Sequence, residues 1–162
     1  AAPAAPAAKA APTATAEPAK PEKEEEAPAT VVKIGLLSPQ TGPIAVYAPG
    51  FEDAANVAIT ALNDSQKSHE FELIVADSGC DGTQAATSAQ SLIDSGVVGI
   101  VGAACSGATL GAIAVAAPAG VPMVSYASTS PAVTTADDDG YLFRVVPSDA
   151  QQSVALVDVV QS

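Results

Sequence analysis

The apolar residues of this chain fall into short runs that alternate with segments of helical periodicity. Five runs are apolar throughout rather than at every second position, a pattern typical of strands buried on both faces of a sheet. These runs span residues 31–37, 71–77, 97–102, 121–126 and 141–146. Apolar residues at helical spacing follow most of the runs and predict helices that begin near Phe51, Thr83, Gly107 and Asp149.

Strands that alternate with helices predict an α/β fold: a doubly wound parallel sheet with helices on both faces. In such sheets, ligands bind beyond the carboxyl ends of the strands, near the point where the strand order reverses. Functional residues are therefore expected in the loops that follow the strands. These loops span residues 38–50, 77–83, 102–107 and 126–131.

Residues 1–30 differ from the rest of the chain, because they contain 13 alanines and 6 of the 13 prolines but no aromatic residue. A segment so poor in large apolar groups cannot offset the entropy of ordering, so we expect a disordered tether. Residues 31–162 have a normal size for one domain with one core. The tract resembles the tether that follows the processing site of exported lipoproteins and surface proteins. A disordered tail of an intracellular protein is the alternative.

The net charge of −12 limits the classes of partner. A surface with few cations repels phosphate backbones, so we expect no nucleic-acid partner. A halophilic origin would also explain the acidity. No apolar run approaches the roughly 20 residues that a membrane-spanning helix needs. The chain begins in the Ala/Pro tract without a signal peptide, which has either been removed or was never present.

The segment GAACSGATLG, residues 102–111, places a serine where the third predicted strand gives way to a helix. Ser106 stands at the expected N-cap of that helix, where a hydroxyl contributes about 1 kcal/mol. The same hydroxyl, together with the unpaired N–H groups of the first turn, is suited to bind an anion such as a carboxylate. The two roles are compatible. Thr83 is expected to cap the preceding helix, and Gln152 to complete a capping box on the last one.

Enzymatic functions fit this segment poorly. A nucleophilic elbow would need glycine in place of Ala104 and Ala108. A phosphate-binding loop would need lysine where Ala108 stands. The single histidine, His69, lies in a polar stretch typical of the surface, and two cysteines without a nearby histidine are too few ligands for a metal. We therefore expect no enzymatic activity, no metal and no cofactor.

The two cysteines follow the second and third predicted strands. Because neighbouring parallel strands end at the same edge, Cys80 and Cys105 are expected at one rim of the sheet. A disulfide between them would close a loop of about 26 residues and stabilise the fold by roughly 3.5 kcal/mol. It would also indicate an oxidising compartment. Two reduced thiols in a cytosolic protein are the alternative.

Two further loops extend the candidate site. The segment YASTSP, residues 126–131, offers hydroxyls and backbone groups after the fourth strand, and beside Ser106 it would form a two-sided polar cradle. Tyr47, after the first strand, would supply an apolar wall to a ligand, although a tyrosine in such a loop is more often a packing anchor. The three aspartates at 137–139 are expected to form a solvated turn rather than a cation site.

Five segments carry a specific resemblance, in their order and spacing. They are KIGLLSPQTGPIAVYA, DSGCDGTQA, VVGIVGAACSGAT, GVPMVSYASTSP and YLFRVVPSD. Together they resemble the N-terminal lobe of the type I periplasmic binding proteins, in particular the leucine/isoleucine/valine-binding family that feeds ABC importers. The resemblance covers residues 31–162 and not 1–30. It implies two α/β lobes that close over a ligand by hinge motion.

The resemblance also implies a role for each candidate site residue. Ser106 matches a serine whose hydroxyl and amide hold the α-carboxylate of the ligand. Ala127 and Thr129 match positions whose carbonyl, hydroxyl and amide bind the α-ammonium and the carboxylate. Tyr47 matches an aromatic residue that packs on the ligand side chain.

Further implications concern the disulfide, the partners and the location. The resemblance implies a disulfide between Cys80 and Cys105 and an ABC transporter permease as partner. It also implies a periplasmic or cell-surface location, in which a lipid could anchor the N-terminus. Residues 31–162 are expected to supply one lobe, truncated before the second lobe that carries the acid for the ammonium. The expected ligand is a branched-chain amino acid or a related small carboxylate. A ligand-sensing domain of a receptor or regulator is the alternative.

Overall fold

A computed structural model of the chain describes residues 30–162, so the tether expected at 1–30 lies, apart from Thr30, outside the described residues. Thr30 opens the first strand, β1 (Thr30–Ser38), and pairs with His69. The folded lobe therefore begins one residue earlier than the composition suggests.

The five predicted strands form one parallel sheet in the order β2-β1-β3-β4-β5. The other strands are β2 (His69–Asp77), β3 (Gly99–Val101), β4 (Met123–Ser125) and β5 (Leu142–Arg144). β1 and β2 pair along their full length of nine residues each, whereas β3, β4 and β5 have three residues each. Gly102, which follows β3, has φ of +133°, a backbone conformation that favours glycine. The predicted parallel sheet is confirmed.

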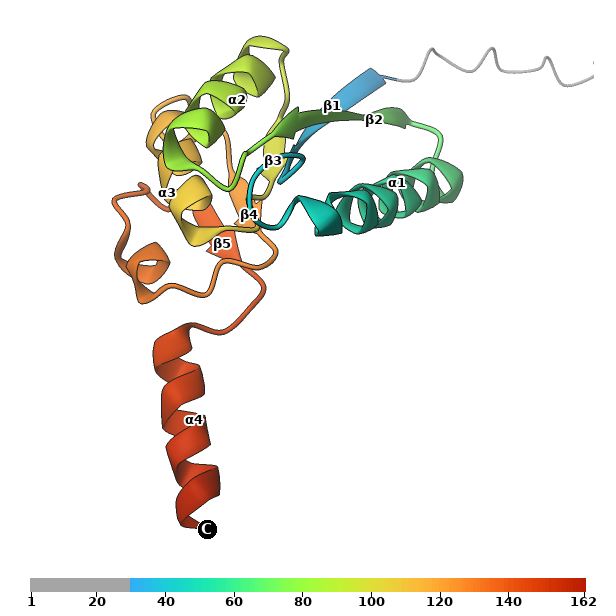
Figure 1. Ribbon diagram of the computed structural model, residues 1–162. Helices are drawn as coiled ribbons and strands as arrows, with labels where there is room; N and C mark the ends of the chain where they lie inside the picture. The colour runs from blue at the N-terminus through green and yellow to red at the C-terminus, as the bar shows by residue number, and fades with distance from the viewer. Residues whose placement is uncertain (1–29) are drawn as a thin grey trace, which may run out of the picture.

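Helices lie on both faces of this sheet, as predicted (Figure 1). α1 lies on one side, whereas α2 and α3 pack side by side on the other. The helices are α1 (Ala48–Ser65), α2 (Gly82–Asp94), α3 (Ser106–Ala116) and α4 (Asp149–Gln161), with two short 3₁₀ helices, η1 (Ala45–Tyr47) and η2 (Pro131–Thr135). α4 extends away from the body, and none of its residues is buried (Figure 1).

The core lies between the sheet and the α2–α3 pair. Small side chains dominate the buried helix faces: Ala85 and Ala89 on α2, and Ala112 and Ala116 on α3. Larger side chains from the strands and from the helix ends fill the remaining space, among them Leu37, Leu92, Ile100, Ile113 and Met123. Because alanine is small, the two helices approach each other and the sheet closely.

The capping residues differ from those expected. Asp81, not Thr83, caps α2, because its carboxylate accepts hydrogen bonds from the amides of Thr83 and Gln84. In α4 the capping box begins at Ser148 and is completed by Gln151. Each correction moves the cap towards the N-terminus, and in both cases a short polar side chain preceded the expected cap.

The backbones of α2 and α3 approach each other closely at Gly82 and Gly111. A Cβ added to Gly111 would overlap the backbone carbonyl of Gly82, and this backbone cannot move aside as a side chain would. A Cβ added to Gly107, on the same helix, would have no atom within 4 Å. The packing of the two helices therefore requires glycine at one position of α3 and not at the other.

We expect Gly111→Ala to lower the free energy of unfolding by about 1–3 kcal/mol, because overpacking outweighs the better helix propensity of alanine. Gly107→Ala is the matched control, and should leave stability unchanged or raise it by up to about 1 kcal/mol. Urea denaturation of the chain, followed by circular dichroism, measures both changes. Equal urea midpoints for Gly111→Ala and the wild type would contradict the close approach.

Candidate functional site

The candidate site lies at the carboxyl edge of the sheet, where the strand order reverses. β2 lies on one side of β1, while β3, β4 and β5 follow on the other. The reversal therefore falls between β1 and β3, which is the place where open α/β sheets bind ligands. The loops after β1, β3 and β4 carry the residues singled out from the sequence.

Ser106 is the first residue of α3 rather than its N-cap. The N-cap is Cys105, and no side chain caps the helix. The expectation that Ser106 caps α3 is therefore wrong, since its Oγ accepts a hydrogen bond of 3.2 Å from the backbone amide of Ser130 in the loop after β4. This contact occupies an acceptor position and leaves the hydroxyl proton of Ser106 able to donate. The first-turn amides of α3 have no capping side chain, which favours an anion there.

The loop after β4 is held by contacts to its backbone carbonyls. Arg144 Nη1 donates to the carbonyl oxygens of Ser130 at 3.0 Å and Ser128 at 3.5 Å. The amide of Asp149, at the start of α4, donates to the carbonyl of Thr129 at 2.8 Å. Three consecutive carbonyls of this loop are therefore bound to other parts of the lobe.

Other polar groups of the same loop remain without a partner. Within residues 30–162, no hydrogen bond engages the backbone of Ala127, nor the amide or the hydroxyl of Thr129. Both residues are half-buried. The structure thus brings Ser106 beside the loop that holds Ala127 and Thr129, and leaves these groups able to meet a ligand.

Tyr47 lies on a different loop from these three residues. It ends η1, on the loop after β1, and 61% of its surface is exposed. In the described part of the chain, neither a hydrogen bond nor an aromatic contact joins Tyr47 to Ser106, Ala127 or Thr129. It lies on a loop of the same rim, with its side chain largely exposed.

Cys80 and Cys105 form a disulfide, with their Cα atoms 5.3 Å apart. The expectation that neighbouring strands bring them together is wrong in one respect, because β1 lies between β2 and β3. The bond instead joins the loop after β2 to the residue that precedes Ser106, and so it anchors the start of α3.

Asp77, which the sequence analysis missed, ties the loop after β1 to the loop after β2. Its carboxylate accepts hydrogen bonds from the amide and hydroxyl of Thr41, at 3.0 and 2.6 Å. It also accepts from the Gly79 amide at 2.8 Å and from Gln84 Nε2 at 2.9 Å. Burial raises the pKa of this carboxyl, but the hydrogen bonds from Thr41, Gly79 and Gln84 outweigh burial and hold the pKa of Asp77 below its ordinary value.

Tyr126 is a second residue that the sequence analysis did not single out. Its hydroxyl donates to the carbonyl of Leu37 at 3.1 Å, and its ring lies 4.8 Å from that of Phe51. Burial, with a smaller contribution from the charge of Glu52, raises the pKa of Tyr126 to about 12. The phenol therefore stays protonated at neutral pH and joins the end of β4 to the end of β1.

With this geometry established, comparison with known proteins assigns the chain to a family. Residues 31–162 match a family described as "Periplasmic binding protein". The chain belongs to this family. Its members are binding proteins rather than enzymes, and they work outside the cytoplasm, as the sequence analysis expected.

Three proteins of known name illustrate what this chain resembles. The leucine-, isoleucine-, valine-, threonine- and alanine-binding protein of Pseudomonas aeruginosa is 32% identical over 128 residues, covering 76% of this chain and 34% of the relative. LivJ, a branched-chain amino acid transporter substrate-binding protein of Streptococcus pneumoniae solved with isoleucine, is 31% identical with a TM-score of 0.68, covering 74% of this chain and 35% of that one. The leucine-binding protein LivK of Thermotoga maritima is 30% identical with a TM-score of 0.67, covering 77% and 35%.

The chain therefore spans about a third of the length of the relatives it matches. Among residues 30–162, no helix of this periplasmic binding protein combines the length and hydropathy needed to cross a bilayer. Within the same range, no three His, Cys, Asp or Glu side chains gather as a metal site would require.

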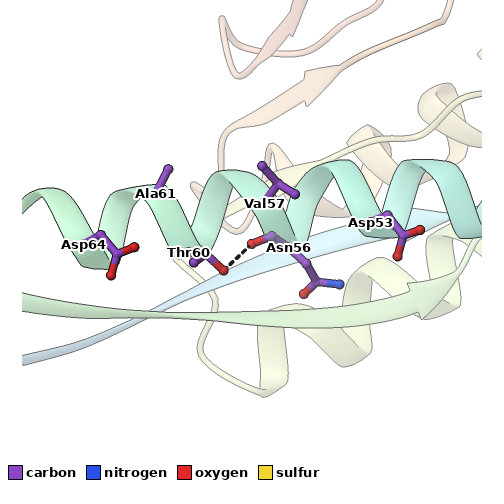
Figure 2. A pocket seen from close by; sticks show the side chains of 6 residues that line it. All are labelled: Asp53, Asn56, Val57, Thr60, Ala61 and Asp64. Carbon is purple, nitrogen blue, oxygen red and sulfur yellow. Dashed lines mark hydrogen bonds between the residues drawn. The ribbon is translucent and has the colours of Figure 1, made fainter.

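A separate hollow lies along α1, and Figure 2 shows the side chains that line it. All of its lining residues come from that single helix: Asp53, Asn56, Val57, Thr60, Ala61 and Asp64. One helix cannot surround a ligand, whereas the rim loops offer groups from several elements. We therefore place the candidate site at the rim.

The disulfide gives the first prediction for this site. Its cysteines are 25 residues apart, so we expect reduction to lower the free energy of unfolding by about 3.5 kcal/mol. Denaturation with and without dithiothreitol measures the loss of stability. Mass spectrometry after thiol alkylation, with and without prior reduction, counts the free thiols. A protein whose cysteines are alkylated without prior reduction would contradict the bond.

Asp77 gives the second prediction for this site. We expect Asp77→Asn to lower the free energy of unfolding by about 1–2 kcal/mol at pH 7, because hydrogen bonds to a charged acceptor are lost. A carboxyl whose pKa is lower in the folded state than in the unfolded state stabilises the fold at any pH above its unfolded-state pKa. This stabilisation is lost as the pH falls through the pKa of the folded state. The difference between wild type and variant should therefore shrink below about pH 4.

Asp94→Asn is the matched control for Asp77→Asn, because Asp94 is exposed and accepts a single side-chain hydrogen bond, from Gln90. Its effect should stay within about 0.5 kcal/mol. Urea titrations at several pH values measure both variants. A stability gap for Asp77→Asn that is the same at pH 3 and pH 7 would show that the charge of Asp77 is not what stabilises the two loops.

Proposed function

We propose that this lobe binds the charged head group of a branched-chain amino acid, as part of the substrate-binding component of an ABC importer. The observation that carries the proposal is the 3.2 Å hydrogen bond from the Ser130 amide to Ser106 Oγ. It holds the start of α3 against the loop that contains Ala127 and Thr129. The proteins from P. aeruginosa, S. pneumoniae and T. maritima, whose names refer to such amino acids, support the choice of ligand.

The carboxylate of the ligand is assigned to the start of α3. The hydroxyl proton of Ser106 and the first-turn amides would donate to it, and the positive end of the helix dipole would favour its charge. The amide of Thr129 would donate from the other side. A carboxylate accepts several hydrogen bonds at once, and these donors come from two elements whose spacing is already set by the contact between Ser130 and Ser106.

The ammonium group is assigned to the carbonyl of Ala127 and the hydroxyl of Thr129. Two neutral acceptors do not neutralise a cation, and a full site would add a carboxylate. We propose that a second lobe supplies this acid and closes over the ligand, with Tyr47 against the ligand side chain. The lobe alone would then be an open half-site with weak affinity, because water remains in contact with both charges.

The proposed protein partner is the membrane permease of an ABC importer. We place the lobe itself outside the cytoplasm, where it would meet the permease. A lipid anchor at the N-terminus remains part of the proposal and concerns residues outside the described range. It has no bearing on how the rim loops hold a ligand.

The test measures amino-acid binding in a polypeptide that carries this lobe together with a second one. We expect L-leucine, L-isoleucine or L-valine to raise the melting temperature. Ser106→Ala and Thr129→Ala should each weaken binding about tenfold or more, because each removes a hydrogen bond to a charged group. Thr135→Ala, an exposed hydroxyl in η2, is the matched control and should bind as the wild type does.

Isothermal titration calorimetry gives the affinities, and the 162-residue chain measured alone should bind more weakly than the two-lobed protein. If Ser106→Ala and Thr129→Ala both bind with wild-type affinity, the assigned site is wrong. If the two-lobed wild type binds no amino acid, the ligand class is wrong.

A further inference from the structure

Three hydroxyl groups lie buried directly behind the rim loops. They belong to Thr109 on α3, Ser125 at the end of β4 and Ser128 in the following loop, and all three residues are 0% exposed. Polar groups buried to this extent are costly unless they are hydrogen-bonded. Their partners therefore show what the three side chains do.

All three hydroxyls converge on the backbone of Ala103. Thr109 Oγ1 accepts from the Ala103 amide at 3.1 Å and lies 2.8 Å from Ser128 Oγ. Ser125 Oγ and Ser128 Oγ lie 2.8 and 3.2 Å from the Ala103 carbonyl oxygen. The Ser128 amide donates to Ser125 Oγ at 3.1 Å. A single peptide segment thus joins α3, β4 and the loop after β4.

The protons of this network can be arranged so that every member has a partner. The Thr109 hydroxyl lies 2.8 Å from Ser128 Oγ and 3.2 Å from the Ala103 carbonyl oxygen, and in this arrangement it donates to Ser128 Oγ. The hydroxyls of Ser128 and Ser125 then donate to the two lone pairs of the Ala103 carbonyl. Removing the Thr109 hydroxyl leaves the buried Ala103 amide without its partner, and removing the Ser125 hydroxyl does the same to the Ser128 amide.

The network lies between the residues assigned to the ligand. Ala103 precedes Ser106 by three positions, and Ser128 stands between Ala127 and Thr129. The loops after β3 and β4 are thus joined in the protein interior by buried hydroxyls. Nearer the surface they are joined by the hydrogen bond between the Ser130 amide and Ser106 Oγ. Their separation is set before any ligand arrives.

We propose that Thr109, Ser125 and Ser128 are positioning residues, which hold the donors of the two loops at the spacing that a ligand carboxylate requires. This inference rests on the proposed function of the same site. Groups fixed in advance bind more tightly, because less conformational entropy is lost when the ligand enters. A purely structural network would affect stability and leave affinity unchanged.

The test compares two substitutions at Thr109 in the two-lobed protein. Thr109→Val keeps the shape but removes the hydroxyl, and should weaken L-leucine binding about tenfold. Thr109→Ser keeps the hydroxyl and should bind within about twofold of the wild type. Ile113→Val, at a buried position on the same helix, is the control for lost stability, and should lower the melting temperature without changing affinity.

Affinities are measured by calorimetry at a temperature where circular dichroism shows each variant folded. If Thr109→Val does not fold, Ser128→Ala replaces it, and weaker leucine binding by that variant is the expected result. A wild type that binds leucine while a folded Thr109→Val or Ser128→Ala binds equally well overturns this inference and leaves the proposed function standing. A two-lobed wild type that binds no amino acid overturns both.

Discussion

At the edge where parallel strands end, the last peptide groups have no partner strand, and this lobe depends on how those groups are hydrogen-bonded. Side chains supply many of the partners. Asp77 accepts from loop amides, and Tyr126 donates to the end of β1. Arg144 donates to carbonyls on either side of Thr129. Among residues 30–162, these contacts leave several groups unpaired at the rim: the backbone of Ala127, the amide and hydroxyl of Thr129, and the uncapped first turn of α3. The proposed ligand is assigned to these groups.

Much of the architecture could be predicted from the sequence. The five strands are apolar at successive positions and were therefore recognisable, and the loops after them were the places to look for function. Burial on both faces was not fully realised, because Val101, Val124 and Phe143 stay exposed on β3, β4 and β5. Ser106 was recognisable because it stands where a strand gives way to a helix. The two cysteines were recognisable because both follow strands, even though β1 separates those strands.

What escaped prediction depends on contacts between distant parts of the chain. In α3 the apolar spacing pointed to a stripe of Leu110, Ile113, Ala114 and Ala117, whereas the buried face includes Thr109 and leaves Ala114 exposed. Apolar residues lie on several sides of this helix, so their spacing did not single out Thr109. Asp77 meets Thr41, 36 positions away, and Tyr126 meets Leu37, 89 positions away. No local pattern marks such partners. The caps of α2 and α4 were misplaced because short polar residues one or two positions apart are each suited to the role.

The contact between α4 and the loop after β4 links the direction of a helix to the candidate site. The first residue of α4, Asp149, donates its amide to the carbonyl of Thr129, while the rest of the helix stands clear of the body (Figure 1). A movement of α4 that displaces Asp149 must therefore carry the Thr129 peptide with it or break that bond. The orientation of the projecting helix and the conformation of the loop after β4 are thus coupled through one hydrogen bond.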